Sequence, residues 1–294
     1  MEKSMQKVLS VDRLSKRYPR QRGFGSFQAV FDVSFDLNRG EILGFLGPNG
    51  AGKTTTMKCI LGLLSLSGGR VEVFGVPPAA ASARRRIGYV PENPDYDFSF
   101  TPSEYLSFFA SMRGISWGAG DTSLLLGRVG LSGWKDARIG KLSKGMRQKL
   151  SLAIALQGAP DLLVMDEPTG GFDPLARKEF RDILTEENAR GASCLLSSHI
   201  LSDIETVCSR ALIIAGGRVV REGSMEELLS SQNRQRILHR MPDSAPVETL
   251  VEPEALQAAI DSIRAGGGEI LEVGRHIESL EDVFLSATGQ GAAL

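Results

Sequence analysis

Two short segments of this sequence carry residues suited to phosphate chemistry. The first spans residues 47–54, Gly-Pro-Asn-Gly-Ala-Gly-Lys-Thr, in which two glycines five positions apart precede a lysine and a threonine. Glycines let the backbone fold tightly around phosphate oxygens and direct its N–H groups toward them. Lys53 would supply a positive charge to the β- and γ-phosphates, and the Thr54 hydroxyl would be a ligand for Mg²⁺. The segment therefore predicts binding of a nucleoside triphosphate with magnesium.

The second segment is a pair of carboxylates at the end of an apolar run. Residues 162–165 read Leu-Leu-Val-Met, as expected for a buried parallel strand, and Asp166 and Glu167 follow. We expect Asp166 to hold magnesium, directly or through water, and Glu167 to polarise an attacking water. His199 ends another predicted strand and would reach the same edge of the sheet. Alone, an acidic loop or a single histidine is more often structural, and the phosphate segment is what favours a catalytic interpretation.

The elements around these residues indicate a mostly parallel sheet. A short apolar strand, 41–46, precedes the phosphate segment, and a helix with one apolar face follows it. Further on, predicted strands at 162–165, 193–197 and 211–214 alternate with predicted helices near 175–190 and 201–209. Strict alternation of this kind predicts helices packed on both faces of a parallel sheet.

Composition excludes several classes of protein. The 294 residues are 42% hydrophobic and 23% charged, which is typical of a globular protein, and the net charge of −1 argues against bulk electrostatic binding of nucleic acid. Three widely spaced cysteines with no CxxC pair suggest neither disulfides nor zinc. The polar N-terminus does not resemble a signal peptide, and no run of about 18 apolar residues occurs. A role at a membrane would therefore need a separate partner.

A third segment adds a family resemblance. Residues 142–148, Leu-Ser-Lys-Gly-Met-Arg-Gln, resemble the signature sequence of the ATP-binding-cassette (ABC) family of ATPases and lie shortly before the Asp166 strand, as in that family. The resemblance covers nearly all of residues 8–225. It implies an α/β fold: a P-loop NTPase (RecA-like) core with an antiparallel β subdomain and a helical subdomain at about 93–157. Together these would form an ATPase domain over residues 1–235.

The resemblance also implies where ATP and Mg²⁺ bind. The residues placed at ATP are Tyr18, Gly47, Pro48, Asn49, Gly50, Ala51, Gly52, Lys53, Thr54 and Thr55. Tyr18 would stack on adenine, although an ordinary tyrosine at a strand end is the alternative. The metal ligands implied are Thr54, Asp166 and Glu92. Glu167 would be the catalytic base, and His199 would sense the γ-phosphate and orient the water.

Other implied roles require a second subunit. Ser143, Lys144 and Gly145 correspond to the signature residues that reach the γ-phosphate of ATP in the opposite subunit. Ser143 is expected to begin a helix, whose N-terminal dipole favours an anion. Asp173 matches the segment that crosses the dimer interface. The partner subunit could be an identical copy or a paralogue.

Two positions depart from the family pattern. Glu92 stands where most members carry glutamine; it keeps an oxygen ligand for Mg²⁺ but adds a negative charge near two other carboxylates. Such a glutamate is familiar in the export-type branch of the family, so we expect activity to survive. In the signature, Lys144 and Met146 replace glycine and glutamine, and Lys144 could alter the affinity of the dimer.

The last part of the chain, residues 236–294, is predicted to be a small α+β accessory domain. A polar, proline-containing segment precedes an amphipathic helix at 255–265 and a strand at 269–273. Residues 279–285, Ser-Leu-Glu-Asp-Val-Phe-Leu, resemble the end of many export-type cassette subunits. An amphipathic capping helix is an equally simple interpretation.

These features together predict the ATP-hydrolysing subunit of an ABC transporter of the export type. It would dimerise with ATP and drive a separate transmembrane permease from the cytoplasmic face of the cell membrane, without binding nucleic acid. Exposed aromatic residues near Phe98, Phe100 and Tyr105 are candidates for the docking site, with simple packing as the alternative.

Two other functions are weaker hypotheses. A soluble cassette ATPase acting on ribosomes or nucleic acid is disfavoured by the single phosphate segment and by the short separation of Lys53 and Ser143, 90 residues. A regulator that binds ATP without hydrolysing it is disfavoured by the presence of Glu167 and His199.

Overall fold

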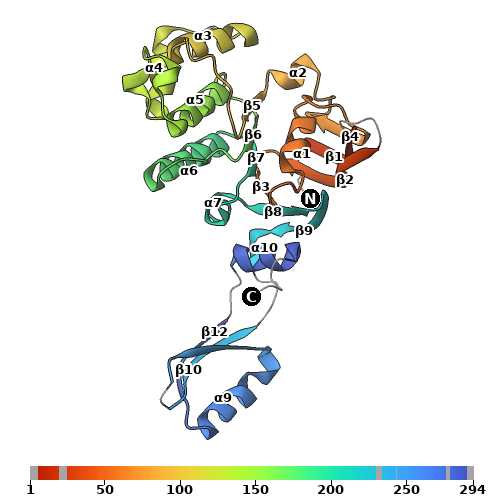
Figure 1. Ribbon diagram of the computed structural model, residues 1–294, viewed down its shortest axis with the longest axis vertical. Coiled ribbons are helices and arrows are strands. Elements are labelled where there is room, and N and C mark those ends of the chain that lie inside the picture. Colours follow the sequence, from red (N-terminus) through yellow and green to blue (C-terminus); the bar gives the residue numbers. More distant parts are fainter. Residues whose placement is uncertain (1–5, 20–24, 230–233, 243, 276–278, 290–294) are drawn as a thin grey trace. The chain divides into compact units, whose positions relative to one another are not determined.

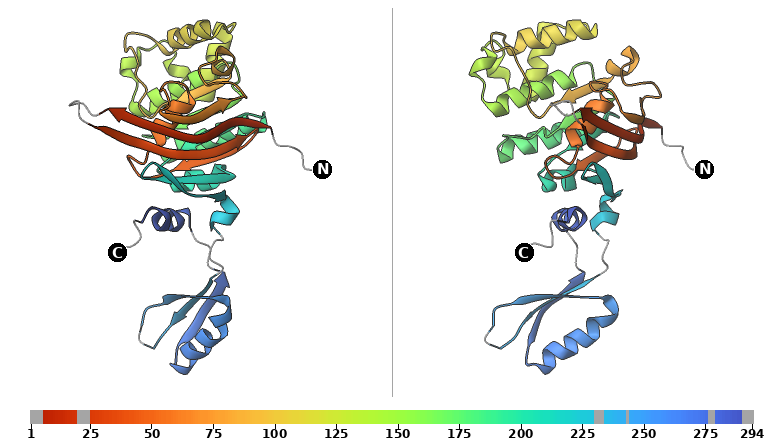
Figure 2. Two further views of the ribbon diagram at one scale, coloured as in Figure 1. Left: turned by 90° about the vertical axis from the view of Figure 1, so that its right-hand side faces the viewer. Right: turned by 45° about the vertical axis from the view of Figure 1, so that its right-hand side comes forward.

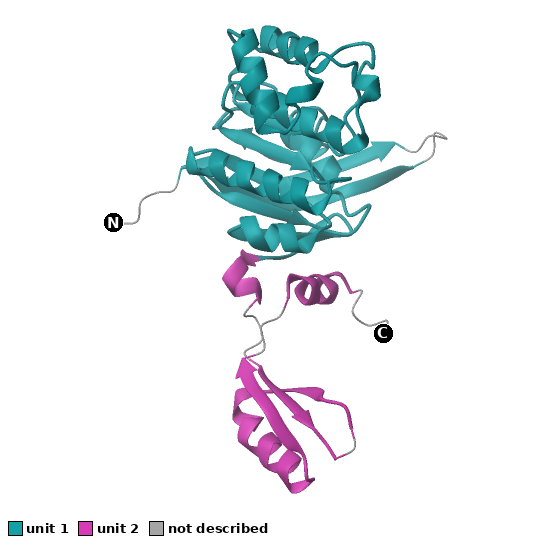
Figure 3. Cartoon of the chain, turned by 90° about the vertical axis from the view of Figure 1, so that its left-hand side faces the viewer, with its two compact units in different colours: residues 1–222 teal, residues 223–294 magenta. Residues whose placement is uncertain are grey.

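The computed structural model describes residues 6–19, 25–229, 234–242, 244–275 and 279–289. The chain divides into two compact units, residues 1–222 and 223–294 (Figure 3). The division falls at Glu222/Gly223, earlier than the boundary after residue 235 that the change in composition suggests. Among the described residues, no helix combines the length and the apolar character that a bilayer span requires.

The first unit is built on a six-stranded sheet. The strand order is β5-β6-β7-β3-β8-β9, and the neighbours from β5 to β8 pair in parallel. Every residue of β3, β6 and β7 is buried, as the apolar runs predict. The strands are β3 (Ile42–Leu46), β5 (Ile87–Val90), β6 (Leu162–Asp166), β7 (Ser193–Ser197), β8 (Arg210–Ala215) and β9 (Arg218–Ser224). The carboxyl ends of the parallel strands meet at one edge, which is where such sheets bind ligands.

A second sheet forms the predicted antiparallel subdomain. It has the order β2-β1-β4, from β1 (Lys7–Pro19), β2 (Ser26–Asn38) and β4 (Gly68–Val73), and Figure 2 shows β1 and β2 running side by side as two long strands. In β2, Val33, Phe35 and Leu37 are buried while Ser34 is exposed, so the alternation in the sequence does mark the face turned to the core.

Helices cover both faces of the parallel sheet. Helix α1 (Lys53–Ile60) lies between the two sheets, and its Met57 and Ile60 belong to a continuous core with side chains of both (Figure 1). Helices α6 (Pro174–Ala189) and α7 (Leu201–Val207) lie on the opposite face (Figure 1). This arrangement confirms the predicted P-loop NTPase core.

The helical subdomain is inserted between β5 and β6. It contains α3 (Pro102–Arg113), α4 (Ala119–Arg128) and α5 (Lys144–Leu156), with short turns η1 (Ser132–Trp134) and η2 (Ile139–Lys141); the small helix α2 (Ala81–Arg84) precedes β5. Helix α3 begins with a capping box between Thr101 and Glu104 and has Pro102 in its first turn, as the sequence predicts.

In its described residues, the second unit has an antiparallel sheet with the order β11-β10-β12, together with helices. Its elements are α8 (Met225–Leu229), β10 (Gln235–Arg240), β11 (Val247–Val251), η3 (Pro253–Ala255), α9 (Leu256–Ala265), β12 (Glu269–Arg275) and α10 (Leu280–Thr288). Helix α10 starts at a capping box formed by Ser279 and Asp282, and it buries Leu280 and Val283. The segment that resembles the end of export-type subunits is therefore an amphipathic helix.

Candidate active site

The phosphate segment forms the turn between β3 and α1. Gly52 caps α1 with φ +105, a conformation that favours glycine, and Gly50 has φ +80. A side chain at Gly47 has no room, because a Cβ there would lie 2.4 Å from the carbonyl oxygen of Ile214. The amide of Ala51 donates to the Pro48 carbonyl at 3.1 Å and closes the loop. The glycines are thus required by the backbone, and the loop leads directly into the positive end of α1.

Lys53 lies inside this loop. Its Nζ donates to the carbonyl oxygen of Gly47 at 2.5 Å and lies 3.7 Å from Oε1 of Glu167. The side chain is buried although it is charged, and burial of a charge is tolerated only with partners of this kind. One ammonium group therefore connects the phosphate loop with the end of β6.

The two carboxylates at the end of β6 are held by different partners. Asp166 is 1% exposed, and its Oδ1 accepts a 2.8 Å hydrogen bond from Oγ of Ser197 on β7. Glu167 follows with φ +50, a strained value for a residue with a side chain. Its amide donates to the same Ser197 Oγ at 3.0 Å. The strained turn directs the two side chains differently, although they are neighbours in the sequence.

His199 binds the far oxygen of Glu167. The backbone amide of His199 donates to Oε2 at 3.0 Å, and its Nδ1 lies 2.5 Å from the same atom. Lys53 is near Oε1, so the carboxylate is fixed between a lysine and a histidine. The imidazole is mostly exposed and belongs to the wall of the cavity described next.

A cavity of about 720 Å³ joins most of the predicted site residues. The cavity is lined by these residues that the sequence predicts for the site: Tyr18, Pro48, Asn49, Gly50, Ala51, Gly52, Lys53, Thr54, Thr55, Glu92, Lys144, Asp166, Glu167 and His199. Phe27, Ala29 and Gly170 also line it and were not singled out by the sequence. Phe27 is the cross-strand partner of Tyr18 and is 56% exposed, so two aromatic rings stand together at this end of the antiparallel sheet.

Four predicted residues do not line the cavity. Gly47 begins the phosphate loop and is packed against β8, because a Cβ on it would meet the carbonyl oxygen of Ile214. Ser143 is the exposed N-cap of α5, and its Oγ accepts from the amide of Met146 at 3.2 Å. A Cβ on Gly145 would lie 3.0 Å from the carbonyl of Gly171, so the start of α5 packs closely on the loop after β6.

Asp173, the fourth of these residues, is the N-cap of α6. Its Oδ1 accepts a 2.8 Å hydrogen bond from the amide of Ala176, and the residue is exposed. Asp173 thus follows the glycine loop on which the start of α5 packs.

The polar atoms of the cavity fit a magnesium ion. Oδ2 of Asp166 is buried and has no hydrogen-bond partner among the described residues, which is costly unless a ligand satisfies it. Thr54 and Glu92 line the same cavity and supply further oxygen atoms. Among the described residues, no group of three or more His, Cys, Asp or Glu side chains could hold a metal alone. A site with few protein ligands is typical of Mg²⁺, which binds one or two carboxylates and completes its coordination shell with water and substrate phosphates.

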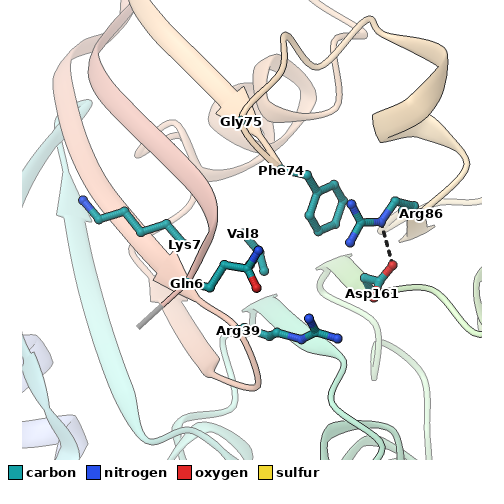
Figure 4. Close-up of a pocket in the computed structure, with 8 residues that line it drawn as sticks. All are labelled: Gln6, Lys7, Val8, Arg39, Phe74, Gly75, Arg86 and Asp161. Atoms are coloured by element: carbon teal, nitrogen blue, oxygen red, sulfur yellow. Dashed lines mark hydrogen bonds and ion pairs between the residues drawn. The ribbon is translucent and has the colours of Figure 1, made fainter. Parts of the chain in front are cut away.

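A smaller cavity of about 240 Å³ lies elsewhere in the first unit (Figure 4). Arg86 stacks on the ring of Phe74 at 3.7 Å and donates to Asp161 at 2.7 Å. None of the predicted site residues lines this cavity. Among its lining residues, Arg86 precedes β5 and Asp161 precedes β6, at the opposite ends of these strands from Glu92 and Asp166, so the cavity is separate from the phosphate site.

The fold and the site define a nucleotide-binding P-loop ATPase. Residues 30–170 match the family model described as ABC transporter. The chain is 37% identical to a Nod factor export ATP-binding protein I of Burkholderia lata, over 92% of this chain and 95% of the relative. It is 34% identical to a fluoroquinolones export ATP-binding protein of Mycobacterium tuberculosis, over 96% of this chain and 94% of that protein. The chain therefore belongs to the family of ATP-binding, ATP-hydrolysing subunits of ABC transporters.

Solved structures give the same fold. The structure of an ATP-binding subunit of an ABC transporter superposes with a TM-score of 0.68 at 32% identity, covering 76% of this chain and 92% of the other. A dimeric post-hydrolysis state of an ATP-binding cassette, bound to ADP and Pi, has a TM-score of 0.69 at 20% identity, covering 74% and 98%, and shows the fold alone. The alternative of a soluble ATPase acting on nucleic acid or ribosomes finds no support among these proteins.

Proposed function

We propose that two copies of this subunit, or one copy and a paralogue, close around ATP and Mg²⁺ and drive export through a separate permease. The observation that carries this proposal is the one cavity shared by the phosphate loop, Asp166, Glu167 and His199. Ser143 lies outside it, exposed at the start of α5. The chain thus offers half of a phosphate site and, elsewhere on its surface, a serine suited to completing another.

Within one subunit, the side chains have distinct roles. Lys53 and the amides of the loop bind the β- and γ-phosphates, and Tyr18 with Phe27 stacks on the base. Mg²⁺, held by Thr54, Asp166 and Glu92, would neutralise charge on the phosphate oxygens. Glu167 accepts the proton of the attacking water through Oε1, because both contacts of His199 are to Oε2. His199 thereby keeps the base in place.

The other side of the γ-phosphate is supplied by the partner. Ser143 presents its hydroxyl and the first amides of α5, which carries no acidic residue in its first turn. A helix start of this kind favours an anion. Gly145 accompanies Ser143, and Asp173 lies at the same interface. Lys144, expected to act with them, lines this subunit's own cavity. Removal of the γ-phosphate by hydrolysis would release the group that both subunits hold.

A groove beside the helical subdomain is suited to the permease. Its volume is about 660 Å³, and it lies between the core and α3. Apolar and aromatic side chains predominate in its lining: Leu61, Leu63, Ile87, Tyr89, Pro91, Pro94, Tyr96, Tyr105, Phe109, Met112 and Ile154. Of the three aromatic residues singled out in the sequence, Tyr105 lines the groove, whereas Phe98 and Phe100 are exposed outside it. An apolar segment of a membrane partner would dock here at the cytoplasmic face of the membrane.

Export is proposed because the relatives named above are export proteins, with Nod factor and fluoroquinolones as their cargo. The second unit, residues 223–294, is proposed to be an accessory domain of this subunit, with its boundary earlier than residue 236. The cargo itself binds the permease.

A mixing experiment tests the shared site. Lys53→Ala and Ser143→Arg are each expected to abolish ATP hydrolysis when measured alone. In a mixed dimer, one site carries both defects and the other combines an unchanged Lys53 with an unchanged Ser143. Mixing the two inactive proteins should therefore restore ATPase activity. A mixture that stays as inactive as its components, while wild-type protein hydrolyses ATP, rules out sites shared between subunits.

A further inference from the structure

A buried amide side chain attaches the signature helix to the loop that carries Glu92. Gln148 lies in α5, is 1% exposed, and donates from Nε2 to the carbonyl oxygen of Pro91 at 2.9 Å. Glu92 is the next residue and lines the nucleotide cavity. Burial of an amide is costly unless it is hydrogen-bonded, and an apolar side chain would fill the same space without that cost. The bond to the Pro91 carbonyl therefore satisfies the buried amide of Gln148.

A second contact binds the other end of the same loop. The Tyr96 hydroxyl donates to the carbonyl oxygen of Arg147, the neighbour of Gln148, at 3.0 Å. Burial raises the pKa of Tyr96 well above its ordinary value, so this phenol remains a donor at all physiological pH values. Residues 91–96 are thus held to α5 at both ends, and Glu92 lies between the two attachments.

The far end of α5 is fixed to the core. A Cβ on Gly88 of β5 would lie 2.3 Å from the carbonyl oxygen of Ala155, so strand and helix are in backbone contact there. Arg113 donates both to the carbonyl of Gln157 at 2.9 Å and to that of Ile87 at 3.0 Å. A shift of the Glu92 loop would therefore act on the N-terminal part of α5, which begins after its N-cap Ser143.

Ser143 stands at that N-terminus. At 1.5 Å per residue it is about 7.5 Å along the helix axis from Gln148, within one rigid element. We propose that Gln148 is a positioning residue that couples the two nucleotide sites of the dimer. It holds the loop of Glu92, which lines the subunit's own site, to the helix whose Ser143 completes the site of the partner. This rests on the proposed function, in which Ser143 acts across the interface.

Loss of the bond between Gln148 and Pro91 is expected to remove the coupling between the two nucleotide sites without weakening nucleotide binding at either site. Coupling between sites is reciprocal and is carried by an element that both sites displace. If the bond from Gln148 to Pro91 is removed, each site still contains its phosphate loop, Asp166 and Glu167. ATP binding at one site would no longer set the position of Ser143 at the other.

The test compares two buried glutamines, Gln148 within α5 and Gln157 at the C-cap of the same helix. Gln148→Met removes the bond to Pro91, and Gln157→Met removes an equivalent 2.8 Å bond from Gln157, 2% exposed, to the carbonyl of Leu106 in the helical subdomain. Both changes should lower the Tm by about 2–8 °C. With the full-length protein, the Hill coefficient of ATP hydrolysis should fall toward about 1 only for Gln148→Met. The Kd of each protein for ADP should stay within about 3-fold of wild type.

A double-mutant cycle gives an independent readout. In a Glu92→Ala background, Gln148→Met should cause no further fall in the Hill coefficient, because the two residues act on one path. Additive losses would overturn the proposal, as would equal effects of Gln148→Met and Gln157→Met or an unchanged Hill coefficient in Gln148→Met. Should Gln148→Met fail to fold, Gln148→Asn, whose shorter amide cannot reach Pro91, takes its place.

Failure of the proposed function would be seen separately. It would appear as wild-type protein that hydrolyses ATP without cooperativity and does not dimerise with ATP, before any variant is compared.

Discussion

The Oγ of Ser197 lies 2.8 Å from Oδ1 of Asp166, across the pair of strands β6 and β7. The two residues are direct neighbours in the parallel register. Because the same Oγ also accepts a hydrogen bond from the amide of Glu167, one hydroxyl positions both acidic residues at the end of β6. Oδ2 of Asp166 is thereby turned away from Ser197 and left without a partner among the described residues.

Ser197→Ala should weaken magnesium use more than nucleotide binding. The change leaves a buried carboxylate oxygen and a backbone amide unsatisfied, which costs about 1–3 kcal/mol. We expect the Mg²⁺ concentration for half-maximal ATPase activity to rise by about 5- to 100-fold. The measurement is a Mg²⁺ titration of ATP hydrolysis at saturating ATP. Ser198→Ala removes the neighbouring hydroxyl, which bonds to the backbone of Ile200, and serves as the control. Equal titration curves for both variants and wild type would refute this role of Ser197.

Lys53→Ala should abolish tight nucleotide binding. The lysine is the buried cation of the phosphate loop, and hydrogen bonds to charged groups contribute about 1.5–3 kcal/mol each. The Kd for ATP should rise by about 10- to 100-fold or more, as measured by isothermal titration calorimetry. Lys58→Ala is the matched control, because Lys58 is exposed in the last turn of the same helix. If the Lys53→Ala protein bound ATP with the wild-type Kd, the assignment of residues 47–54 as the phosphate-binding loop would be wrong.

Local patterns in the sequence were sufficient for much of this molecule. The turn of residues 47–52 is indicated by its glycines, because Gly50 and Gly52 adopt positive φ values that favour glycine. The start of α3 after Thr101 follows from its capping box. The alternation of strands and helices from 162 onward predicts α6 near 175–190, and the structure has it at Pro174–Ala189. These features depend on residues a few positions apart, so they can be read without knowledge of the fold.

Contacts between distant strands could not be predicted in the same way. Phe27 joins Tyr18 only through the register of β1 and β2, which shifts at several irregularities along the pair. The role of Ser197 depends on its alignment with Asp166, 31 residues earlier. The positive φ of Glu167 likewise has no signal in its own residue type, which ordinarily avoids it. Long-range register and backbone strain were therefore outside the reach of the sequence, whereas the chemistry of the site was not.

Phe27→Ala should weaken the binding of the base and leave that of the phosphates unchanged. Stacking of a base on an aromatic ring contributes about 1–3 kcal/mol, so the Kd for ATP should rise by about 5- to 100-fold. The Kd for inorganic tripolyphosphate, which has no base, should not change. Both are measured by calorimetry, with Phe98→Ala as the control, because Phe98 is a similarly exposed ring, 55%, outside the cavity. An equal loss of affinity for ATP and for tripolyphosphate would indicate that Phe27 supports the structure of the phosphate loop and does not stack on the base.

Glu167→Gln should separate binding from hydrolysis. The amide keeps the size of the side chain and loses the basic oxygen, and removal of a general base typically costs about 10²- to 10⁴-fold in rate. ATP should still bind, and because it is not consumed, the dimer should persist with ATP and Mg²⁺ and be absent with ADP, as measured by light scattering after gel filtration. Glu179→Gln is the control, since Glu179 is a partly exposed residue of α6 paired with Lys149 at 2.8 Å, and its ATPase rate should match wild type. If Glu167→Gln hydrolysed ATP at the wild-type rate, the base would have to be another group. Asp166 and His199 would then be the first residues to replace, because both line the same cavity.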